Sequence, residues 1–144
     1  MTEADLKRAL VNSLRGQDGD AFRIEDRYRT GVPDLLMVVK DGPGFIIEAK
    51  LIKGGGTKLM CTPMQASYLE RFHRPPGFFA AIIAYSDVRG ALYIGQPGQA
   101  VKDCRFIPRP SRLESRDWLI SDLLWKLVFD QRRLDVGQVP TYMK

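Results

Sequence analysis

Two acidic residues and a lysine interrupt a stretch of the chain, residues 31–50, that otherwise has the composition of buried β-strands. A charge inside a buried strand is costly unless a partner compensates it. We therefore expect Asp34 and Glu48 to share a compensating group, and a divalent metal ion suits them because it prefers oxygen ligands. Lys50 lies on the face of Glu48, since side chains alternate along a strand. The stretch predicts a charged site built into a β-sheet.

This stretch is predicted to fold as a β-hairpin. Its two apolar arms, residues 35–40 and 45–50, flank an Asp-Gly-Pro-Gly turn. A loop of three residues places Asp34 opposite Lys50 and diagonal to Glu48, so that both acids reach one ion. A loop of two or four residues would put the acids on opposite faces, unless a bulge intervened.

The order of these residues resembles the PD-(D/E)XK nuclease signature, with Pro33-Asp34 followed by Glu48-Ala49-Lys50. The longer run resembles the virus-type replication-repair nuclease (VRR-NUC) branch, which adds a glycine-rich basic loop and a helix that opens near a glutamine. The parts that match here are residues 31–35, residues 54–58 and Gln65, within about residues 1–95. The alternative is a surface hairpin whose glutamate and lysine form an ion pair, and the apolar flanking residues disfavour it.

The resemblance implies an α/β fold, with a restriction-endonuclease-like core in which helices flank a central mixed β-sheet. It implies a DNA endonuclease that uses Mg²⁺ or Mn²⁺, held by Asp34, Glu48 and the carbonyl group of Ala49, with Lys50 beside the attacking water. Because small nucleases of this group, often phage-borne, include Holliday junction resolvases, branched DNA is the expected substrate. The alternatives are a nickase, an exonuclease, a restriction-type enzyme and a non-catalytic nucleic-acid-binding module.

The first helix is predicted to begin after Thr2 and to run to about Leu14, with Asp5 in a capping-box position. Glu3 lies on the same stripe of this helix as Leu6, so it faces the core. It is either a further catalytic metal ligand or an acid favoured by the helix dipole. The resemblance favours the ligand, since related nucleases carry an acid on their first helix.

A strand is predicted over residues 21–28, with Phe22 and Ile24 facing the core and the arginines facing solvent. Arg29, at the end of this strand, is a predicted contact to nucleic acid. Two acids of the same predicted strand, Glu25 and Asp26, are second-choice metal ligands. Acids in such a position are more often ion-pair partners of a neighbouring arginine.

The loop after the hairpin, residues 53–61, contains three glycines together with Lys53 and Lys58. Two cations in a mobile loop suit a phosphate backbone, although a flexible connector explains the glycines equally well. Thr62 and the proline after it predict the start of a helix in which Gln65 completes a capping box. The resemblance instead makes Gln65 a site residue that contacts the substrate or a metal-bound water, and one side chain is able to do either.

The chain is predicted to form a single nuclease domain, residues 1–144, with a core over about residues 1–95. Further strands are expected at 78–85 and 91–94. The C-terminal extension, 96–144, is expected to begin irregularly and then to form a helix. This helix, near residues 116–132, has apolar residues on more than one face. It is therefore either buried on two sides or an oligomer contact, and a homodimer would suit an enzyme that acts on two strands.

The 144-residue chain carries 22 lysines and arginines against 17 acids, a net charge of +5. A basic balance favours an anionic partner, most often nucleic acid. No secretory signal and no membrane-spanning stretch is recognisable in the sequence, so no membrane partner is expected. Two isolated cysteines, Cys61 and Cys104, suggest a reducing cytoplasm, and one histidine leaves too few ligands for a zinc site.

Overall fold

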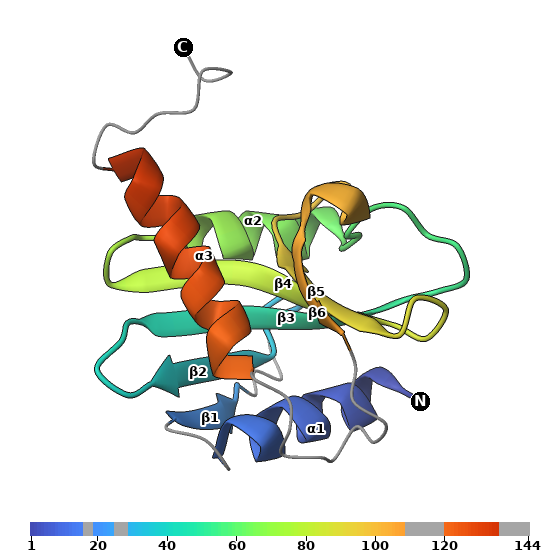
Figure 1. Ribbon diagram of the computed structural model, residues 1–144, viewed down its shortest axis with the longest axis horizontal. Helices are drawn as coiled ribbons and strands as arrows, with labels where there is room; N and C mark the ends of the chain where they lie inside the picture. The colour runs from blue at the N-terminus through green and yellow to red at the C-terminus, as the bar shows by residue number, and fades with distance from the viewer. Residues whose placement is uncertain (16–18, 25–28, 109–119, 136–144) are drawn as a thin grey trace.

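The structure is a computed structural model that describes residues 1–15, 19–24, 29–108 and 120–135, with the side chains of the last segment described to Phe129. A mixed β-sheet forms its centre and helices lie on both faces, which confirms the predicted α/β class (Figure 1). The elements are α1 (Glu3–Arg15), β1 (Gly19–Arg23), β2 (Leu35–Val39), β3 (Gly44–Ile52), α2 (Pro63–Phe72), β4 (Phe78–Ser86), β5 (Ala91–Gly95), η1 (Val101–Asp103), β6 (Arg105–Pro108) and α3 (Ile120–Asp135).

The strands follow one another across the sheet in the order β1-β2-β3-β4-β5-β6. Neighbouring strands are antiparallel except for β3 and β4, which are parallel and are joined through α2. Parallel neighbours require a crossover of this kind, whereas antiparallel ones need only a turn. The crossover carries the chain from the end of β3, near Lys50, through the loop of residues 53–62 to the start of α2.

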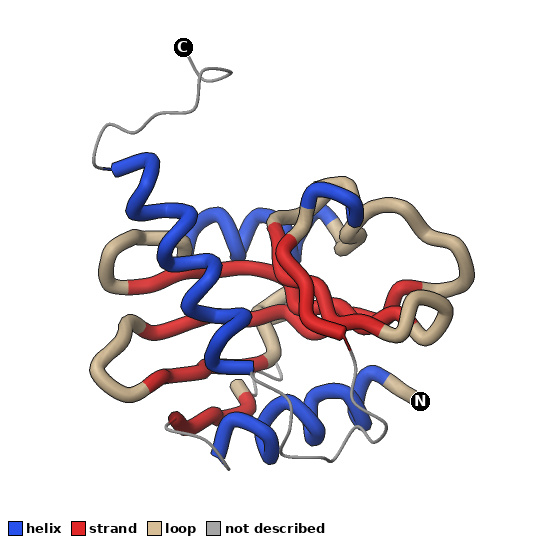
Figure 2. Tube along the Cα trace, in the orientation of Figure 1, coloured by secondary structure: helices blue, strands red, loops and turns tan. Residues whose placement is uncertain are grey.

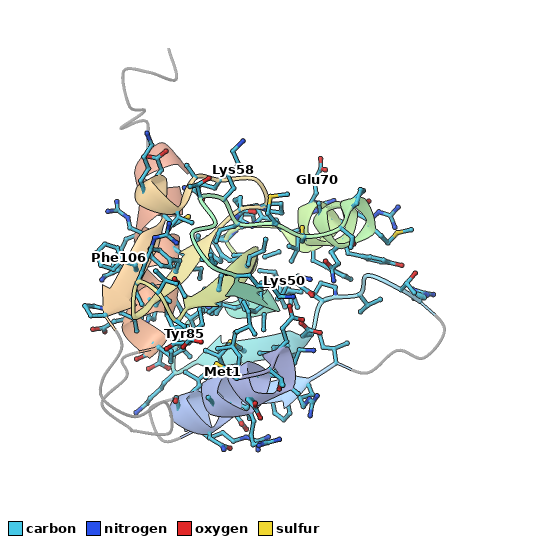
Figure 3. All side chains as sticks on the ribbon, turned by 90° about the vertical axis from the view of Figure 1, so that its right-hand side faces the viewer. Met1, Lys50, Lys58, Glu70, Tyr85 and Phe106 are labelled. Atoms are coloured by element: carbon cyan, nitrogen blue, oxygen red, sulfur yellow. The ribbon has the colours of Figure 1, made fainter. Side chains whose placement is uncertain are left out.

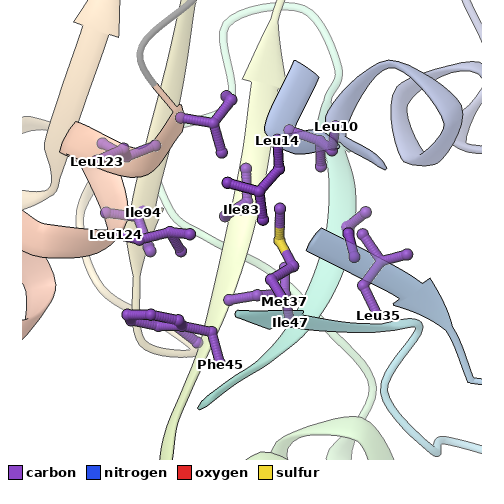
Figure 4. Close-up of a cluster of buried hydrophobic side chains, with 14 of the residues drawn as sticks. Leu10, Leu14, Leu35, Met37, Phe45, Ile47, Ile83, Ile94, Leu123 and Leu124 are labelled. Carbon is purple, nitrogen blue, oxygen red and sulfur yellow. The ribbon is translucent and has the colours of Figure 1, made fainter. Parts of the chain in front are cut away.

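Helices lie on both faces of the sheet (Figure 2). Hydrophobic side chains fill the space between these helices and the sheet. Helices α1 and α3 cover one face, where Leu10 and Leu124 belong to the same cluster as Phe45 and Ile83 (Figure 4). Helix α2 covers the other face through Leu69. Strands that are covered on both faces have near-continuous apolar sequences, which is what β3 and β4 show.

Two predictions about the sheet edges are wrong. Strand β1 ends at Arg23, and its buried side chain is that of Ala21, whereas Phe22 is 48% exposed. The predicted irregular start of the C-terminal extension instead contains strand β6, which pairs with β5. A proline is tolerated at the end of a short edge strand, because one side of such a strand has no hydrogen-bonding partner. Because prolines usually argue against a strand, Pro108 made β6 difficult to predict from the sequence.

The C-terminal helix forms, but within the described residues it runs from Ile120 to Asp135 rather than over 116–132, and residues 116–119 lie outside them. Its buried face, with Ile120 and Val128, packs on the same core as α1. Phe129, on another side of the helix, is 56% exposed. The C-terminal extension therefore completes the core that residues 1–95 begin, through β6 and α3. None of the helices in the described residues is both long and apolar enough to cross a membrane.

Candidate active site

The hairpin of β2 and β3 brings the two predicted acids to one face, although its loop is longer than expected. Val38 is the partner of Gly44 and Leu35 is the partner of Ile47, so five residues, 39–43, separate the last paired positions. The expected register, with a three-residue loop, is therefore wrong by two residues. A shift of two keeps every side chain on its face. If the register is continued by one pair beyond Leu35 and Ile47, Asp34 lies directly opposite Glu48 instead of diagonal to it.

Asp34 lies just before β2, where its carboxylate has two partners. Its Oδ2 accepts a hydrogen bond from the backbone N–H of Ala49 at 3.2 Å. Its Oδ1 forms an ion pair with Nζ of Lys7 at 2.9 Å, and both side chains are 20% exposed. Both contacts fix the position of this carboxylate.

Glu48 is the most buried charged group of the site, with 3% of its surface exposed. Its Oε1 accepts a hydrogen bond from Nε2 of Gln65 at 3.0 Å and lies 3.9 Å from Nζ of Lys50. Its Oε2 is buried and has no hydrogen-bond partner among the described residues. Burial first, and then the adjacent carboxylate of Asp34, raise the pKa of Glu48 to about 8, against the opposing effect of Lys50 and Lys7.

The structure confirms the capping-box role of Gln65 and places its side chain against Glu48, while its contact with the substrate or a metal-bound water stays a prediction. Its backbone N–H donates to Oγ1 of Thr62 at 3.2 Å, and its Oε1 accepts from the backbone N–H of Thr62 at 2.9 Å, which is a complete capping box. The amide nitrogen of the same side chain remains and donates to Glu48. The cap therefore fixes the side chain that holds the glutamate in place.

A glycine allows the loop before Asp34 to approach the start of α2. Gly31 has a φ of +86°, and a Cβ atom there would lie 2.5 Å from Cγ of Met64 and 3.1 Å from the backbone nitrogen of Gln65. Only glycine adopts this backbone conformation readily, and only glycine leaves room for this contact. The glycine of the Gly-x-Pro-Asp run thus joins the two segments that supply Asp34 and Gln65.

The proline of the same run frees a backbone oxygen. If the register of β2 and β3 continued, Pro33 would stand opposite Ala49, whose N–H already points to the β2 side because it donates to Asp34. The N–H and the carbonyl group of one strand residue point to the same neighbour, and a proline has no N–H to donate. The carbonyl group of Ala49 therefore points to the β2 side, where Pro33 offers it no N–H, and its part as a metal ligand stays a prediction.

The structure does not bring Glu3 together with the other acids. Among the described residues, no three acidic, histidine or cysteine side chains lie close enough to share a metal ion. Glu3 occupies the first turn of α1, one turn before Lys7, and it is Lys7 that reaches Asp34. The part of Glu3 as a ligand stays a prediction, and the second-choice acids, Glu25 and Asp26, lie outside the described residues.

Three of the four predicted nucleic-acid contacts are exposed, whereas the fourth, Gln65, is half-buried. Lys53, Lys58 and Arg29 lie at the surface, the lysines in the loop that follows β3. The second half of this loop is more ordered than its glycines suggest, since the backbone N–H of Leu59 donates to Gln99 and that of Val101 donates to Thr57. A cavity of about 270 Å³ opens beside Lys50 and is also lined by Lys53 and Lys58. The loop thus holds two further cations next to the site.

These residues fit a divalent cation. Two adjacent carboxylates supply oxygen ligands, and the unpartnered Oε2 of Glu48 is a buried acceptor that a cation would satisfy. A freed backbone carbonyl would supply a third oxygen. Mg²⁺ is commonly held by one or two carboxylates, with water and substrate phosphate completing its octahedron, so a third acid is not required.

Comparisons with known proteins agree with this fold. No protein-family model and no curated protein matches the chain. Seven chains of solved structures match it, and one of them is the Holliday junction resolvase Hjc of the archaeal hyperthermophile Archaeoglobus fulgidus. The match has a TM-score of 0.53 and 20% sequence identity, and it covers 65% of this chain and 75% of the resolvase. This chain shares the fold of that resolvase over the matched part of its length.

Lys7 is the site residue that sequence reasoning missed. It lies four residues after Glu3, so both project from the same side of α1. The predicted apolar stripe of this helix consists of Leu6, Leu10 and Leu14, and Lys7 directly follows Leu6 in the sequence. A lysine next to a core stripe usually covers apolar surface with its stem, so the sequence carried no separate signal for an ion pair with Asp34.

Proposed function

We propose that the protein is a DNA endonuclease that depends on Mg²⁺ or Mn²⁺ and acts on branched DNA. The observation that carries this proposal is the pair formed by Asp34 and Glu48, with one buried glutamate oxygen that lacks a partner. A structural ion pair would leave no such oxygen, because an unsatisfied buried acceptor is costly. A site that binds a cation leaves such an oxygen without a protein partner, because the cation is its partner.

Each side chain of the site has a role in phosphodiester hydrolysis. Asp34, Glu48 and the carbonyl group of Ala49 would hold the metal ion, which supplies Lewis acidity and lowers the pKa of a bound water. Lys50 stabilises negative charge as it develops on the phosphate, from a position 3.9 Å from the glutamate. Gln65 fixes the glutamate, and Lys7 holds the carboxylate of Asp34 in position.

The surface around the site suits a polyanion. Lys53 and Lys58 line the cavity next to Lys50, and the chain as a whole carries a charge of +5. Lysines and arginines that neutralise phosphates make binding weaken linearly with the logarithm of salt concentration. Arg29, exposed just before the Gly-x-Pro-Asp run, would extend this contact.

Branched DNA is proposed because a resolvase of four-way junctions shares the fold. A junction presents two equivalent strands for cleavage, which a symmetric pair of active sites serves well. We include a homodimer in the proposal, and the exposed Phe129 on α3 is an apolar side chain available for such a contact.

The test is a cleavage assay on a panel of labelled DNAs, comprising linear duplex, nicked duplex, flap and four-way junction. We expect paired cuts in the junction with Mg²⁺ or Mn²⁺, none with EDTA, and none from a Glu48→Gln variant purified in parallel. Preferred cleavage of nicked or linear DNA would instead identify a nickase, an exonuclease or a restriction-type enzyme. Binding of DNA without cleavage under any metal would show a non-catalytic module and would refute the proposal.

A further inference from the structure

A second and larger hollow, of about 500 Å³, lies apart from the two carboxylates. It is formed where the loop after β3 meets β5, η1 and the edge strand β6. Two aromatic side chains and three cations line it, and none of its lining residues is acidic. These residues are Tyr93, Phe106, Lys58, Arg89 and Lys102, which we call the aromatic-basic pocket.

The aromatic part of this pocket presents an open ring. Phe106 and Tyr93 are cross-strand partners whose ring centroids lie 5.7 Å apart, with their planes inclined by 37°. Tyr93 is 8% exposed, whereas Phe106 is 52% exposed on the edge strand. The inner ring therefore supports the outer one, which leaves the exposed surface of Phe106 available for stacking.

The basic side chains of the pocket are not neutralised by ion pairs within the described segments. Lys58, Arg89 and Lys102 are exposed, and none of them has an ion-pair partner within the described segments. Their backbone positions are fixed, because Lys58 lies in a β-bridge with Ala100 and Lys102 lies in η1. Cations held in place around an aromatic ring form the usual arrangement for a phosphate with a base attached to it.

The pocket is continuous with the candidate active site through one lysine. Lys58 lines the aromatic-basic pocket and also the cavity beside Lys50. Figure 3 looks onto this side of the molecule, with Lys50 at the centre, Lys58 above it and Phe106 to the left. A strand that passes Lys50 therefore meets Lys58 before it reaches Phe106.

We propose that the aromatic-basic pocket binds an unpaired nucleotide of the DNA substrate. Its base stacks on Phe106, and its phosphates contact Lys102 and Arg89, while Lys58 bridges to the active site. The nucleotide is unpaired because a base within a duplex already has both faces covered by its neighbours. This inference rests on the proposed function and adds to it a preference for strands with single-stranded character near the cut.

The experiment measures binding of a fluorescein-labelled 12-mer of deoxythymidine by anisotropy, in EDTA so that cleavage plays no part. For Phe106→Ala we expect affinity to fall about 5- to 50-fold, as the loss of one base–aromatic stack predicts, with an unchanged dependence on salt. For Lys102→Ala we expect the slope of log K against log[salt] to fall by about 0.7, as the loss of one phosphate contact on a single strand predicts. Phe106→Trp should restore the binding.

Matched controls lie at the far edge of the sheet. Phe22 on β1 is 48% exposed, close to the 52% of Phe106, and it does not line the aromatic-basic pocket, so Phe22→Ala removes a similar ring from another part of the sheet. Lys40→Ala removes the same charge as Lys102→Ala from the loop between β2 and β3. Equal losses for Phe106→Ala and Phe22→Ala would overturn the inference, because they would show a general effect of the substitution.

Two further outcomes decide the matter. If Phe106→Ala binds the 12-mer as the wild type does but changes from dimer to monomer on a sizing column, a second copy of the chain occupies the pocket and the inference fails. The other outcome is that the wild type binds the 12-mer, and Phe106→Ala and Lys102→Ala change this binding as expected, while no DNA is cleaved with Mg²⁺ or Mn²⁺. In that case the nucleotide pocket stands and only the proposed endonuclease activity fails.

Discussion

Replacing Glu48 by glutamine should remove a pH-dependent contribution to the stability of the metal-free protein. Burial and the neighbouring Asp34 raise the pKa of Glu48 from 4.5 to about 8 in the folded state. Between these two values the folded protein holds one proton more than the unfolded chain. The contribution of Glu48 is therefore full below its unfolded pKa of 4.5 and is lost as the pH rises through its folded pKa of about 8.

The size of this effect follows from the difference between the two pKa values. One pKa unit corresponds to about 1.4 kcal/mol, so the free energy of unfolding should fall by up to about 1.4 kcal/mol per pH unit between pH 5 and 8. The total has an upper bound of about 5 kcal/mol. Asp5 and Asp20 do not interfere, because hydrogen bonds from Thr2 and Arg15 lower their pKa values and their contributions are lost only at more acidic pH.

The assay is urea unfolding followed by tryptophan fluorescence, from pH 5 to 8.5 in EDTA, for the wild type and for Glu48→Gln. We expect the wild type to lose stability relative to the variant as the pH rises, and saturating Mg²⁺ to remove the loss, because the metal ion takes the place of the proton. Glu70→Gln, which removes an exposed acid of α2, should follow the wild type. Parallel curves for the wild type and Glu48→Gln would refute the raised pKa.

The remaining predictions concern the parts around this glutamate. Lys50→Ala should keep the fold and metal binding but lower the rate of cleavage about 10²- to 10³-fold, as measured in single-turnover assays, and unchanged cleavage would remove the lysine from the mechanism. Thr62→Ala should lower stability by about 1 kcal/mol through its cap alone and leave cleavage intact, whereas Gln65→Ala should lower both; equal cleavage by the two variants would limit the glutamine to its cap. Gly31→Ala should cost about 1–3 kcal/mol in thermal unfolding, and combining it with Met64→Ala should recover the steric part; no recovery would place the whole cost in the backbone conformation.

Much of the site could be predicted from the sequence because its signals are local. Two charges among apolar strand residues define the face that they share, and alternation fixes that face whether the loop holds three or five residues. The capping box of Thr62 and Gln65 depends on a spacing of three residues and needs no tertiary information. These predictions were confirmed by the register and by the hydrogen bonds of the cap.

The parts that sequence reasoning missed depend on contacts between distant segments. The partner of Lys7 lies 27 positions further along the chain, at Asp34, and no periodicity reports such a pair. Strand β6 is short and ends in a proline, so its identity comes from pairing with β5 rather than from its own residues. Phe22 was expected to face the core because it is large, but the small Ala21 fills that place under α1.

The first and last helices of the fold share one core, and this arrangement has a consequence for biosynthesis. Leu10 and Leu124 belong to the same cluster as Phe45, so the face of the sheet around that phenylalanine stays uncovered until α3 has been made. The segments that supply the acids and Gln65 leave the ribosome much earlier. A nascent chain thus carries the groups of the proposed site before it has the scaffold to hold them, and cleavage competence should arise only after α3 has emerged and packed.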